Sequence, residues 1–490
     1  MRSKVVQVHV STRRTAQIVG CVAATVMLCA GPATATPSVS GPLAPANPYL
    51  GPVGTSTMHG DAGSSDVTPL PGPGTGPHEV TAFPMMAACP TVLQGSDGMI
   101  VSLCTTMIGQ IPTIHLIDPK ADATPLGRSV AQLPLAKGSL LGGVYAYLDN
   151  ENRLVAVDGN RQLVRISHAQ NPDGSWRLEL ADVIDLSGAV AADDNVTGLA
   201  PDWDGNVWFA TGHGTVGYVG TDRIAHSIAL PEGEQVQNSI STSPTGTAVA
   251  TTHALYQLKR SGDEVVIDWR QPYDRGPARN PGQLSWGTGS TPTYFGPSTG
   301  SDFLTIVDNA HPTVSLHVYR ADTGAEVCTQ PVLSAASKDG SPSGSENSPV
   351  GIGHSVYVAG TYGYPYPTTP EGAGPAVPAT APFNGGMTRV DIDPVGCHVV
   401  WDNTIRSSAV PHLSTADGSI YTVTRDGAPN TSPLDGYSFA VIDSKDGSQI
   451  GSTPLPSTIL NDTLQMSALI TESGEYFQGT ISGIVRVRAN

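Results

Sequence analysis

Short apolar segments that each follow a turn recur along this chain, and this repeat limits the possible folds more than any other feature. Eight such segments begin at residues 100, 154, 207, 248, 303, 356, 420 and 476, so that successive starts lie 41 to 64 residues apart. A repeat of this length, with about four short strands in each unit, is typical of a β-propeller, in which every small sheet covers the face of the next. We therefore predict an all-β propeller, with eight blades and with seven as the alternative.

A second repeat supports the first. Val318–Gly324, Val390–Gly396 and Val441–Gly447 share a valine, five further residues and a glycine. Each pattern indicates a strand, an acidic turn and a glycine that permits positive φ before another strand. The composition agrees, because 55 Gly, 41 Pro and only 14% charged residues favour short strands and tight turns.

The two ends of the predicted propeller, residues 78–490, complete one blade together. The last apolar segment leaves room for only three strands, and residues 78–87 ("HEVTAFPMMA") can supply a fourth, outer strand. One Pro-rich stretch, residues 362–386, interrupts the strand-like sequence, and we expect it to be a long surface loop.

The first 77 residues are predicted to lie outside the fold. Residues 1–35 combine a basic start, an apolar run and the small-residue motif Ala33–Ala35, which is typical of a cleaved signal peptide. We therefore expect a secreted protein. A lipobox ending at Cys21 leaves a lipid-anchored lipoprotein as the alternative. Residues 36–77 are rich in Pro, Gly and Ser without apolar periodicity, which predicts a disordered linker.

The charge of the chain excludes one class of partner. The whole chain has a formal net charge of −17, and without the four basic residues of the signal it keeps 21 Lys and Arg against 42 Asp and Glu, a net of −21. Nucleic-acid binding needs a basic face, so we expect no nucleic-acid partner. We also expect a monomer with no membrane span after the signal is removed.

The cysteines outside the signal indicate two disulfides. Four remain, which is an even number in an exported protein and allows three pairings. We prefer Cys89–Cys104, whose short spacing adjacent strands can close, and Cys328–Cys397, because both follow the Val-x5-Gly turn in consecutive blades.

Three strand starts carry the candidate site. A polar residue followed by Asn precedes the inner strand of three predicted blades, and inner-strand starts of a propeller face one funnel. Asn and carboxylate oxygens are suitable ligands for Ca²⁺, so Ca²⁺ is the candidate cofactor. The alternative is that these residues only cap turns or line a water-filled channel. The candidate ligand or metal-binding residues are Asp194, Asn195, Asn238, Glu346 and Asn347.

Two family resemblances follow from these motifs. The stretch "GLAPDWDGNVWFAT", residues 198–211, resembles the blade signature of SMP-30/gluconolactonase and streptogramin-lyase-like propellers. The Val-x5-Gly segments, one of them followed by Trp401, resemble the pyrroloquinoline-quinone-type repeat of eight-bladed quinoproteins.

These resemblances imply different sites. The first group would place a divalent cation near the axis, with Asn195, Asn238 and Asn347 in the Asn roles and Glu346 as the carboxylate. The lyase-like group would use a His and an acid on a cyclic ester, for which His213 is the nearest candidate. The quinoproteins would show a vicinal Cys pair, and this chain has none, which puts quinone-dependent oxidation in doubt.

Three functions are compatible with the sequence. No complete catalytic constellation is visible, so we favour a secreted propeller that binds a small molecule or an extracellular protein at its central funnel. The first alternative is an extracellular metal-assisted hydrolase or lyase acting on a small ester or lactone. The second alternative is a quinoprotein-like oxidoreductase.

Overall fold

The computed structural model describes residues 40–120, 129–138, 145–337 and 339–490, together with Met1 and Gln7. The predicted signal peptide, apart from those two residues, lies outside the described residues. The chain divides into the units Met1–Pro37 and Ser38–Asn490, and all the strands described below belong to the second unit.

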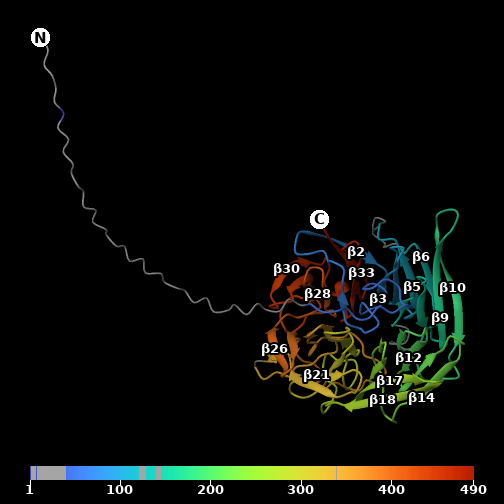
Figure 1. Cartoon of the computed structure of the whole chain (residues 1–490). Coiled ribbons are helices and arrows are strands. Elements are labelled where there is room, and N and C mark those ends of the chain that lie inside the picture. The colour runs from blue at the N-terminus through green and yellow to red at the C-terminus, as the bar shows by residue number, and fades with distance from the viewer. Residues whose placement is uncertain (2–6, 8–39, 121–128, 139–144, 338) are drawn as a thin grey trace. The chain divides into compact units, whose positions relative to one another are not determined.

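Eight sheets are arranged around a central axis, which confirms the prediction of an eight-bladed all-β propeller (Figure 1). Each described blade is an antiparallel sheet, and the blades are numbered here in chain order. Blade 1 consists of β3 (Ala87–Gln94), β4 (Ile100–Thr106), β5 (Pro112–Ile117) and β6 (Ala131–Pro134), and blade 2 of β7 (Tyr147–Leu148), β8 (Leu154–Val157), β9 (Gln162–Gln170) and β10 (Trp176–Asp185). Blade 3 consists of β11 (Val196–Pro201), β12 (Val207–Thr211), β13 (Thr215–Val219) and β14 (Ala225–Ala229), and blade 4 of β15 (Ser241–Ser243), β16 (Gly246–Ala250), β17 (Ala254–Ser261) and β18 (Glu264–Pro272).

The second half of the ring repeats this order. Two short 3₁₀ turns, η1 (Ala335–Ser337) and η2 (Ile459–Asn461), lie between strands. Blade 5 consists of β19 (Thr293–Phe295), β20 (Phe303–Val307), β21 (Ser315–Arg320) and β22 (Glu326–Pro331). Blade 6 consists of β23 (Val350–Ile352), β24 (Ser355–Ala359), β25 (Met387–Asp393) and β26 (Gly396–Asn403). Blade 7 consists of β27 (His412–Ser414), β28 (Ser419–Arg425), β29 (Tyr437–Asp443) and β30 (Gln449–Pro454).

Blade 8 is built from both ends of the folded unit. It contains β31 (Ala468–Ile470), β32 (Tyr476–Thr480) and β33 (Gly483–Ala489) from the C-terminal end, and β2 (His78–Pro84) as its outer strand. β2 runs antiparallel to β33, with His78 opposite Ala489 and Pro84 opposite Gly483. The prediction that residues 78–87 supply the missing strand is therefore confirmed.

Each pair of neighbouring blades shares a hydrophobic core. Among the described residues there are eight apolar clusters, and each contains side chains from two consecutive blades, including blades 8 and 1. The reason is the two-residue period of a strand. In β12, Val207 and Phe209 pack toward blade 2, whereas Trp208 and Ala210 pack toward blade 4. The eight segments of the sequence repeat are the second strands of the blades, which are buried on both faces.

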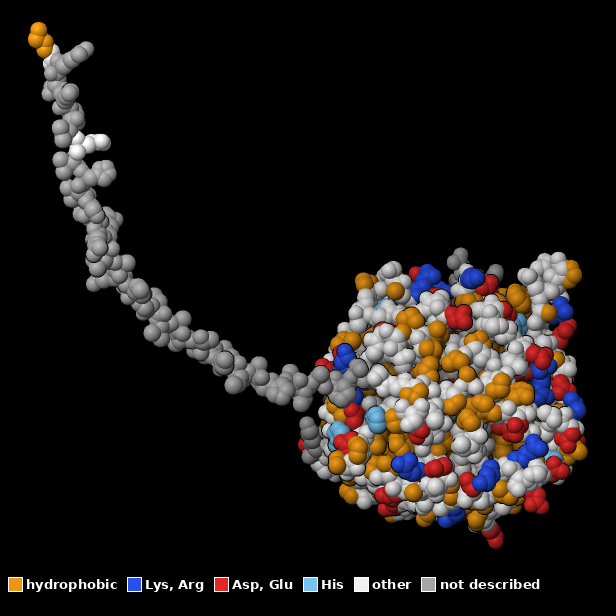
Figure 2. All heavy atoms as spheres, viewed as in Figure 1, with side chains coloured by type: hydrophobic (Ala, Val, Ile, Leu, Met, Phe, Trp, Pro, Cys, Tyr) orange, Lys and Arg blue, Asp and Glu red, His pale blue; other side chains and the backbone are white. Residues whose placement is uncertain are grey.

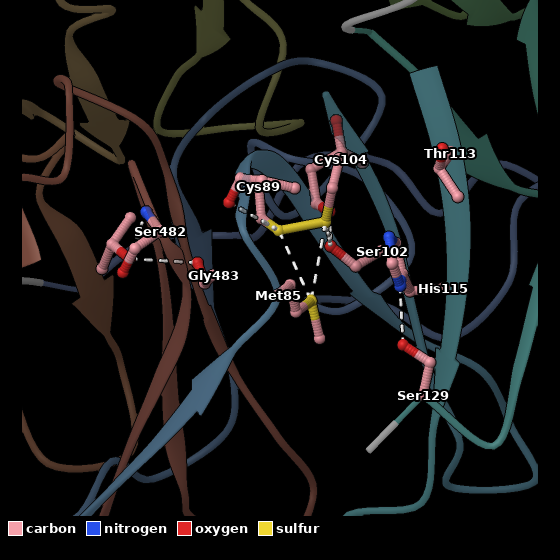
Figure 3. Close-up of a disulfide and its surroundings, with 12 residues drawn as sticks. Met85, Cys89, Ser102, Cys104, Thr113, His115, Ser129, Ser482 and Gly483 are labelled. Atoms are coloured by element: carbon pink, nitrogen blue, oxygen red, sulfur yellow. Dashed lines mark hydrogen bonds between the residues drawn. A yellow bond between two sulfur atoms is a disulfide. The ribbon is translucent and has the colours of Figure 1, made fainter. Parts of the chain in front are cut away.

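Both predicted disulfides are present. Cys89 on β3 and Cys104 on β4 join adjacent strands of blade 1, with Cα atoms 4.0 Å apart, and the sulfur of Met85 lies 3.7 and 3.9 Å from their sulfurs (Figure 3). Cys328 on β22 and Cys397 on β26 join the outer strands of blades 5 and 6, with Cα atoms 5.8 Å apart. Such pairs are typical of proteins that fold in an oxidising environment.

The expected linker is wrong for its described part, residues 40–77. Residues 55–68 run inside the ring and bond to the inner strands of several blades, and β1 (Val67–Thr68) pairs parallel with β27. The carbonyl oxygens of Ser56, Ala62, Gly63, Ser65 and Asp66 accept from the backbone N–H groups of Leu148, Thr242, Tyr294, Gly351 and Leu413. We call residues 55–68 the inner segment. Backbone hydrogen bonds hold it, so it needs no apolar period in its sequence.

The Pro-rich stretch 362–386 is only partly a surface loop. It connects β24 to β25, and several of its residues between 365 and 382 are exposed, as expected. However, Tyr362, Tyr364 and Phe383 are buried, and the Tyr364 hydroxyl donates to Asp462 in the linker before β31. The loop is therefore tied to residues that follow blade 6 in the chain, through Tyr364 to Asp462 and through the Phe383 N–H to the Pro429 carbonyl oxygen.

The visible surface carries mixed charge. Figure 2 shows acidic and basic side chains mostly around the edge of one face, with hydrophobic side chains between them. This distribution agrees with the absence of a basic stripe in the sequence. Among the described residues, no helix has the length and apolar character needed to cross a membrane.

Candidate functional site

A cavity of about 410 Å³ lies at the centre of the ring. Every blade except blade 3 contributes at least one described residue to its wall, mainly from the starts of inner strands. Met58 and His59 of the inner segment border one side, and Tyr366 to Pro370 of the Pro-rich loop border another. The wall is largely apolar, with a few polar groups, which is the usual character of a small-molecule site.

Three of the five predicted ligand residues border this cavity. Asn238 precedes β15, and Glu346 and Asn347 precede β23, so the starts of two inner strands bring them together. Asp194 and Asn195 instead border a separate depression beside β11. The expected convergence of three strand starts therefore holds for two.

Asp194 has a structural role in its turn. Its Oδ1 atom accepts hydrogen bonds from the backbone N–H of Asn195 at 2.8 Å and of His213 at 3.0 Å. The His213 side chain is 56% exposed, and its Nδ1 atom lies 3.9 Å from Asp194 Oδ1. His213 borders a polar depression together with Asn195, and this depression adjoins the cavity that contains Glu346, because Gln110, Thr368 and Pro370 border both.

Glu346 is the most unusual group of the cavity. It is 7% exposed, and neither carboxylate oxygen has a hydrogen-bond partner among the described residues. Its backbone is held in place, because its N–H donates to Thr361 Oγ1 at 2.9 Å. Gly289 makes room for the side chain, since a Cβ atom there would overlap the Glu346 carboxylate. The carboxyl group is thus positioned by its surroundings but left without a partner.

Burial raises the pKa of Glu346 to about 8. The Leu284 backbone amide, the Arg279 guanidinium and the Asn238 side chain offset part of that rise. None of these three groups meets either carboxylate oxygen in hydrogen-bonding geometry. At neutral pH the acid is therefore mostly protonated, because burial outweighs the three groups that favour the carboxylate.

Two tyrosines accompany Glu346 in the cavity wall. The Tyr145 hydroxyl donates to Asn238 Oδ1 at 3.4 Å. Burial, and after it the charge of Glu346, raise the pKa of both Tyr145 and Tyr366 above that of a free phenol. Both hydroxyls therefore remain protonated, and both side chains border the same cavity as the Glu346 carboxyl group.

Asn347 forms part of the cavity wall and is held there by hydrogen bonds. Its Nδ2 atom donates to Gln465 Oε1 at 2.9 Å, and Gln465 Nε2 donates to the Ser407 carbonyl at 3.0 Å. Leu464 and Gln465 have φ of +52° and +57°, which non-glycine residues rarely adopt. Such backbone strain is often found at binding sites, and here both residues border the cavity.

The described donors do not fit a closed calcium site. Ca²⁺ takes six to eight oxygen ligands, and the cavity wall offers one carboxylate, that of Glu346, with the Asn238 amide near it. Within the described ranges, no group of three or more His, Cys, Asp or Glu side chains is arranged to hold a metal ion. Ca²⁺ binding thus stays a prediction that this arrangement does not favour.

Some cavity residues could not be found by the sequence argument. Met58 and His59 lie in the part predicted to be a linker, and Tyr366 lies in the predicted surface loop. The only sequence signal for Tyr366 is the aromatic density of "YGYPYP" at 362–367. Tyr145 precedes a two-residue strand and has no motif around it.

Comparisons with known proteins support the fold. No family model matches the chain. An uncharacterized protein of Archaeoglobus fulgidus is 29% identical over 182 residues, which cover 34% of this chain and 33% of that protein, so the match spans about a third of the relative's length.

Solved structures with similar folds include two dehydrogenases. A europium-containing methanol dehydrogenase has a TM-score of 0.51 at 10% identity, covering 88% of this chain and 98% of that one. The quinohemoprotein alcohol dehydrogenase from Comamonas testosteroni has a TM-score of 0.51 at 10% identity, covering 88% and 80%. BamB from Moraxella catarrhalis has a TM-score of 0.37 at 12% identity, covering 76% and 97%. The expected likeness to quinoprotein propellers thus holds for the fold alone.

Proposed function

We propose that this propeller is a secreted protein that binds a small molecule in its central cavity, with Glu346 as the group that orients the ligand. The observation that carries the proposal is the unpartnered carboxyl of Glu346, 7% exposed, in a cavity of about 410 Å³. A buried polar group without a partner costs about 1–3 kcal/mol. A ligand that supplies the partner recovers this free energy.

The rest of the cavity supports a small ligand. The volume falls within the usual range for ligand pockets, about 300–1,000 Å³. The Met58, Met107 and Met466 side chains border it and offer adaptable apolar contacts. The two disulfides support secretion, because they form in oxidising compartments.

The enzymatic alternatives have less support. For a hydrolase or lyase, His213 would have to act with an acid on one substrate, but it borders a different depression from Glu346. For a quinoprotein-like oxidoreductase, the likeness to the two dehydrogenases concerns the fold alone. No specific observation among the described residues favours either enzymatic alternative.

A neutral fluorescent probe tests the proposed function. N-phenyl-1-naphthylamine fluoresces strongly in apolar surroundings, and we expect it to bind the full chain saturably with a stoichiometry of one. Ser348→Phe should abolish this binding, because Ser348 borders the cavity and is 4% exposed. Ser298→Phe, at an exposed position, is the matched control and should bind as the wild type does. Unsaturable binding, or equal binding by both variants, would overturn the proposal.

A further inference from the structure

We infer that the ligand of the central cavity is an organic cation, an amine or a quaternary ammonium compound, held by the Glu346 carboxylate and the rings of Tyr145 and Tyr366. This inference rests on the proposed function and names its ligand class. It starts from the juxtaposition of one unpartnered buried carboxyl group and two tyrosines in the wall of the same cavity.

The charges around the cavity leave a place for a cation. Among the described residues that border it, Glu346 is the only carboxylate, and no Lys or Arg is present. His59 is the only basic side chain among the described wall residues, and its Nδ1 atom lies 2.9 Å from Asp66, which is fully buried. An anionic ligand would therefore meet Glu346 without a free countercharge, whereas a cationic ligand would supply the charge that Glu346 lacks.

Burial raises the pKa of Glu346, and three polar groups nearby offset part of that rise. The Leu284 amide, the Asn238 amide and the Arg279 guanidinium all lower its pKa. Arg279 is not among the described residues that border the cavity, and its Nε and Nη1 atoms donate to the carbonyl oxygens of Gly374 and Gln283. A site for a neutral ligand would need only an amide at position 346, which keeps the hydrogen-bonding capacity without the ionisable group.

The tyrosines add the second element of a cation site. Cations bind over aromatic faces, and aromatic cages are used to bind quaternary ammonium groups. Tyr145 and Tyr366 both border the cavity, and the Glu346 charge acts on both hydroxyls. Tyr366 lies in the Pro-rich loop, whose anchor is the buried Tyr364, so the loop brings an aromatic ring to the cavity.

Binding of a permanent cation should be linked to a proton. Glu346 must ionise to pair with the cation, so each bound ligand releases up to one proton below pH 8. The charged and titratable groups near Glu346 are Arg279, Tyr145 and Tyr366, and His59 borders the same cavity. The two tyrosines and the arginine keep their protons in this range. Any titration of His59 remains in a Glu346→Gln variant, which isolates the Glu346 contribution.

The test compares choline with its neutral isostere, 3,3-dimethylbutan-1-ol, as competitors of N-phenyl-1-naphthylamine on the full chain. At pH 8.5 we expect choline to compete at least tenfold better than the alcohol. Lowering the pH to 6.5 should weaken choline about 25-fold and leave the alcohol unchanged, because the fraction of ionised Glu346 falls by that factor. Glu346→Gln, whose own affinity for the probe is measured first, should remove the preference and leave only the pH dependence that His59 contributes, and Tyr366→Leu should weaken choline severalfold.

Several outcomes would overturn the inference. They are equal competition by choline and the alcohol in the wild type, a charge preference that survives Glu346→Gln, or displacement by calcium chloride at lower concentration than choline requires. In all three cases the neutral probe still binds, so the proposed function would stand. Failure of the probe itself to bind would contradict the proposed function instead.

Discussion

At the scale of single residues, Glu346 is the group whose surroundings explain most about this protein. Ordinary buried carboxylates are paired, because an unpaired charge in the interior is expensive. Here Gly289 leaves space for the side chain, and Thr361 holds its backbone, yet both oxygens remain without a partner among the described residues. The folded protein therefore keeps the acid protonated until about pH 8.

This shift predicts a loss of stability with rising pH. Between the ordinary pKa of 4.5 and about 8, the unfolded chain has released the Glu346 proton and the folded protein retains it. The folded state binds more protons, so the free energy of unfolding decreases as the pH rises through this window. From pH 5 to pH 8 the loss should be roughly 4 kcal/mol larger in the wild type than in Glu346→Gln.

Urea unfolding of both proteins at pH 5, 6.5 and 8 measures this difference. The comparison cancels groups other than Glu346, such as Asp61, whose pKa burial raises to about 6. Parallel pH profiles for the wild type and the variant would contradict the shifted pKa.

At the scale of elements, each of two turns packs against a tryptophan side chain of the preceding blade. Gly324 follows β21 and Gly447 follows β29, and both have positive φ, +66° and +73°. A Cβ atom at either position would overlap an indole ring, that of Trp269 or Trp401. Those indoles donate to backbone carbonyl oxygens of the same turns at 2.9 and 3.1 Å. Two of the three Val-x5-Gly segments thus form a contact between blades as well as a turn, whereas a Cβ atom at Gly396 of the third would meet nothing within 4 Å.

Substitutions at two glycines distinguish the cost of backbone strain from the cost of steric overlap with the indole. Gly447→Ala should lower the free energy of unfolding by about 2–4 kcal/mol, because it combines a left-handed backbone with a clash against Trp401. Gly418→Ala is the matched control, since Gly418 has φ of +70° but only the Ser444 hydroxyl nearby. It should lose only about 1–2 kcal/mol. Equal losses in urea unfolding would show that the indole contact contributes nothing.

At the scale of the whole molecule, both ends of the folded unit hold the ring together. β2 completes blade 8, and the inner segment links the inner strands of several blades through backbone hydrogen bonds. Because each such bond contributes about 0.5–1.5 kcal/mol net, the inner segment contributes several kcal/mol to the ring. It also carries Met58 and His59, which border the central cavity.

Removal of this segment should therefore affect both stability and binding. A chain that begins at Pro71 should melt at a lower temperature than the full chain and should lose the N-phenyl-1-naphthylamine site. A synthetic peptide of residues 40–70, added separately, should restore both properties. An unchanged melting temperature in thermal unfolding would mean that the inner segment does not stabilise the ring.

Much of the fold could be predicted from local pattern and residue type. The eight apolar segments at regular spacing indicate blades, and the three-strand remainder at the end indicates that residues 78–87 complete the ring. The positions of Cys328 and Cys397 after equivalent turns place them on neighbouring outer strands. In each case the repeat itself carries the information, because an equivalent position in each blade has an equivalent place in the ring.

Only the tertiary structure showed that the inner segment runs inside the ring and which polar residues share the central cavity. The inner segment has no apolar period, since its partners are backbone groups of strands far along the chain, and so it resembled a linker. Asn195 and Asn238 have the same local motif, yet only Asn238 borders the cavity with Glu346. The sequence repeat determines each blade and the start of each inner strand. The shape of the central cavity depends instead on inserted loops and on the inner segment, because these parts of the chain do not follow the repeat.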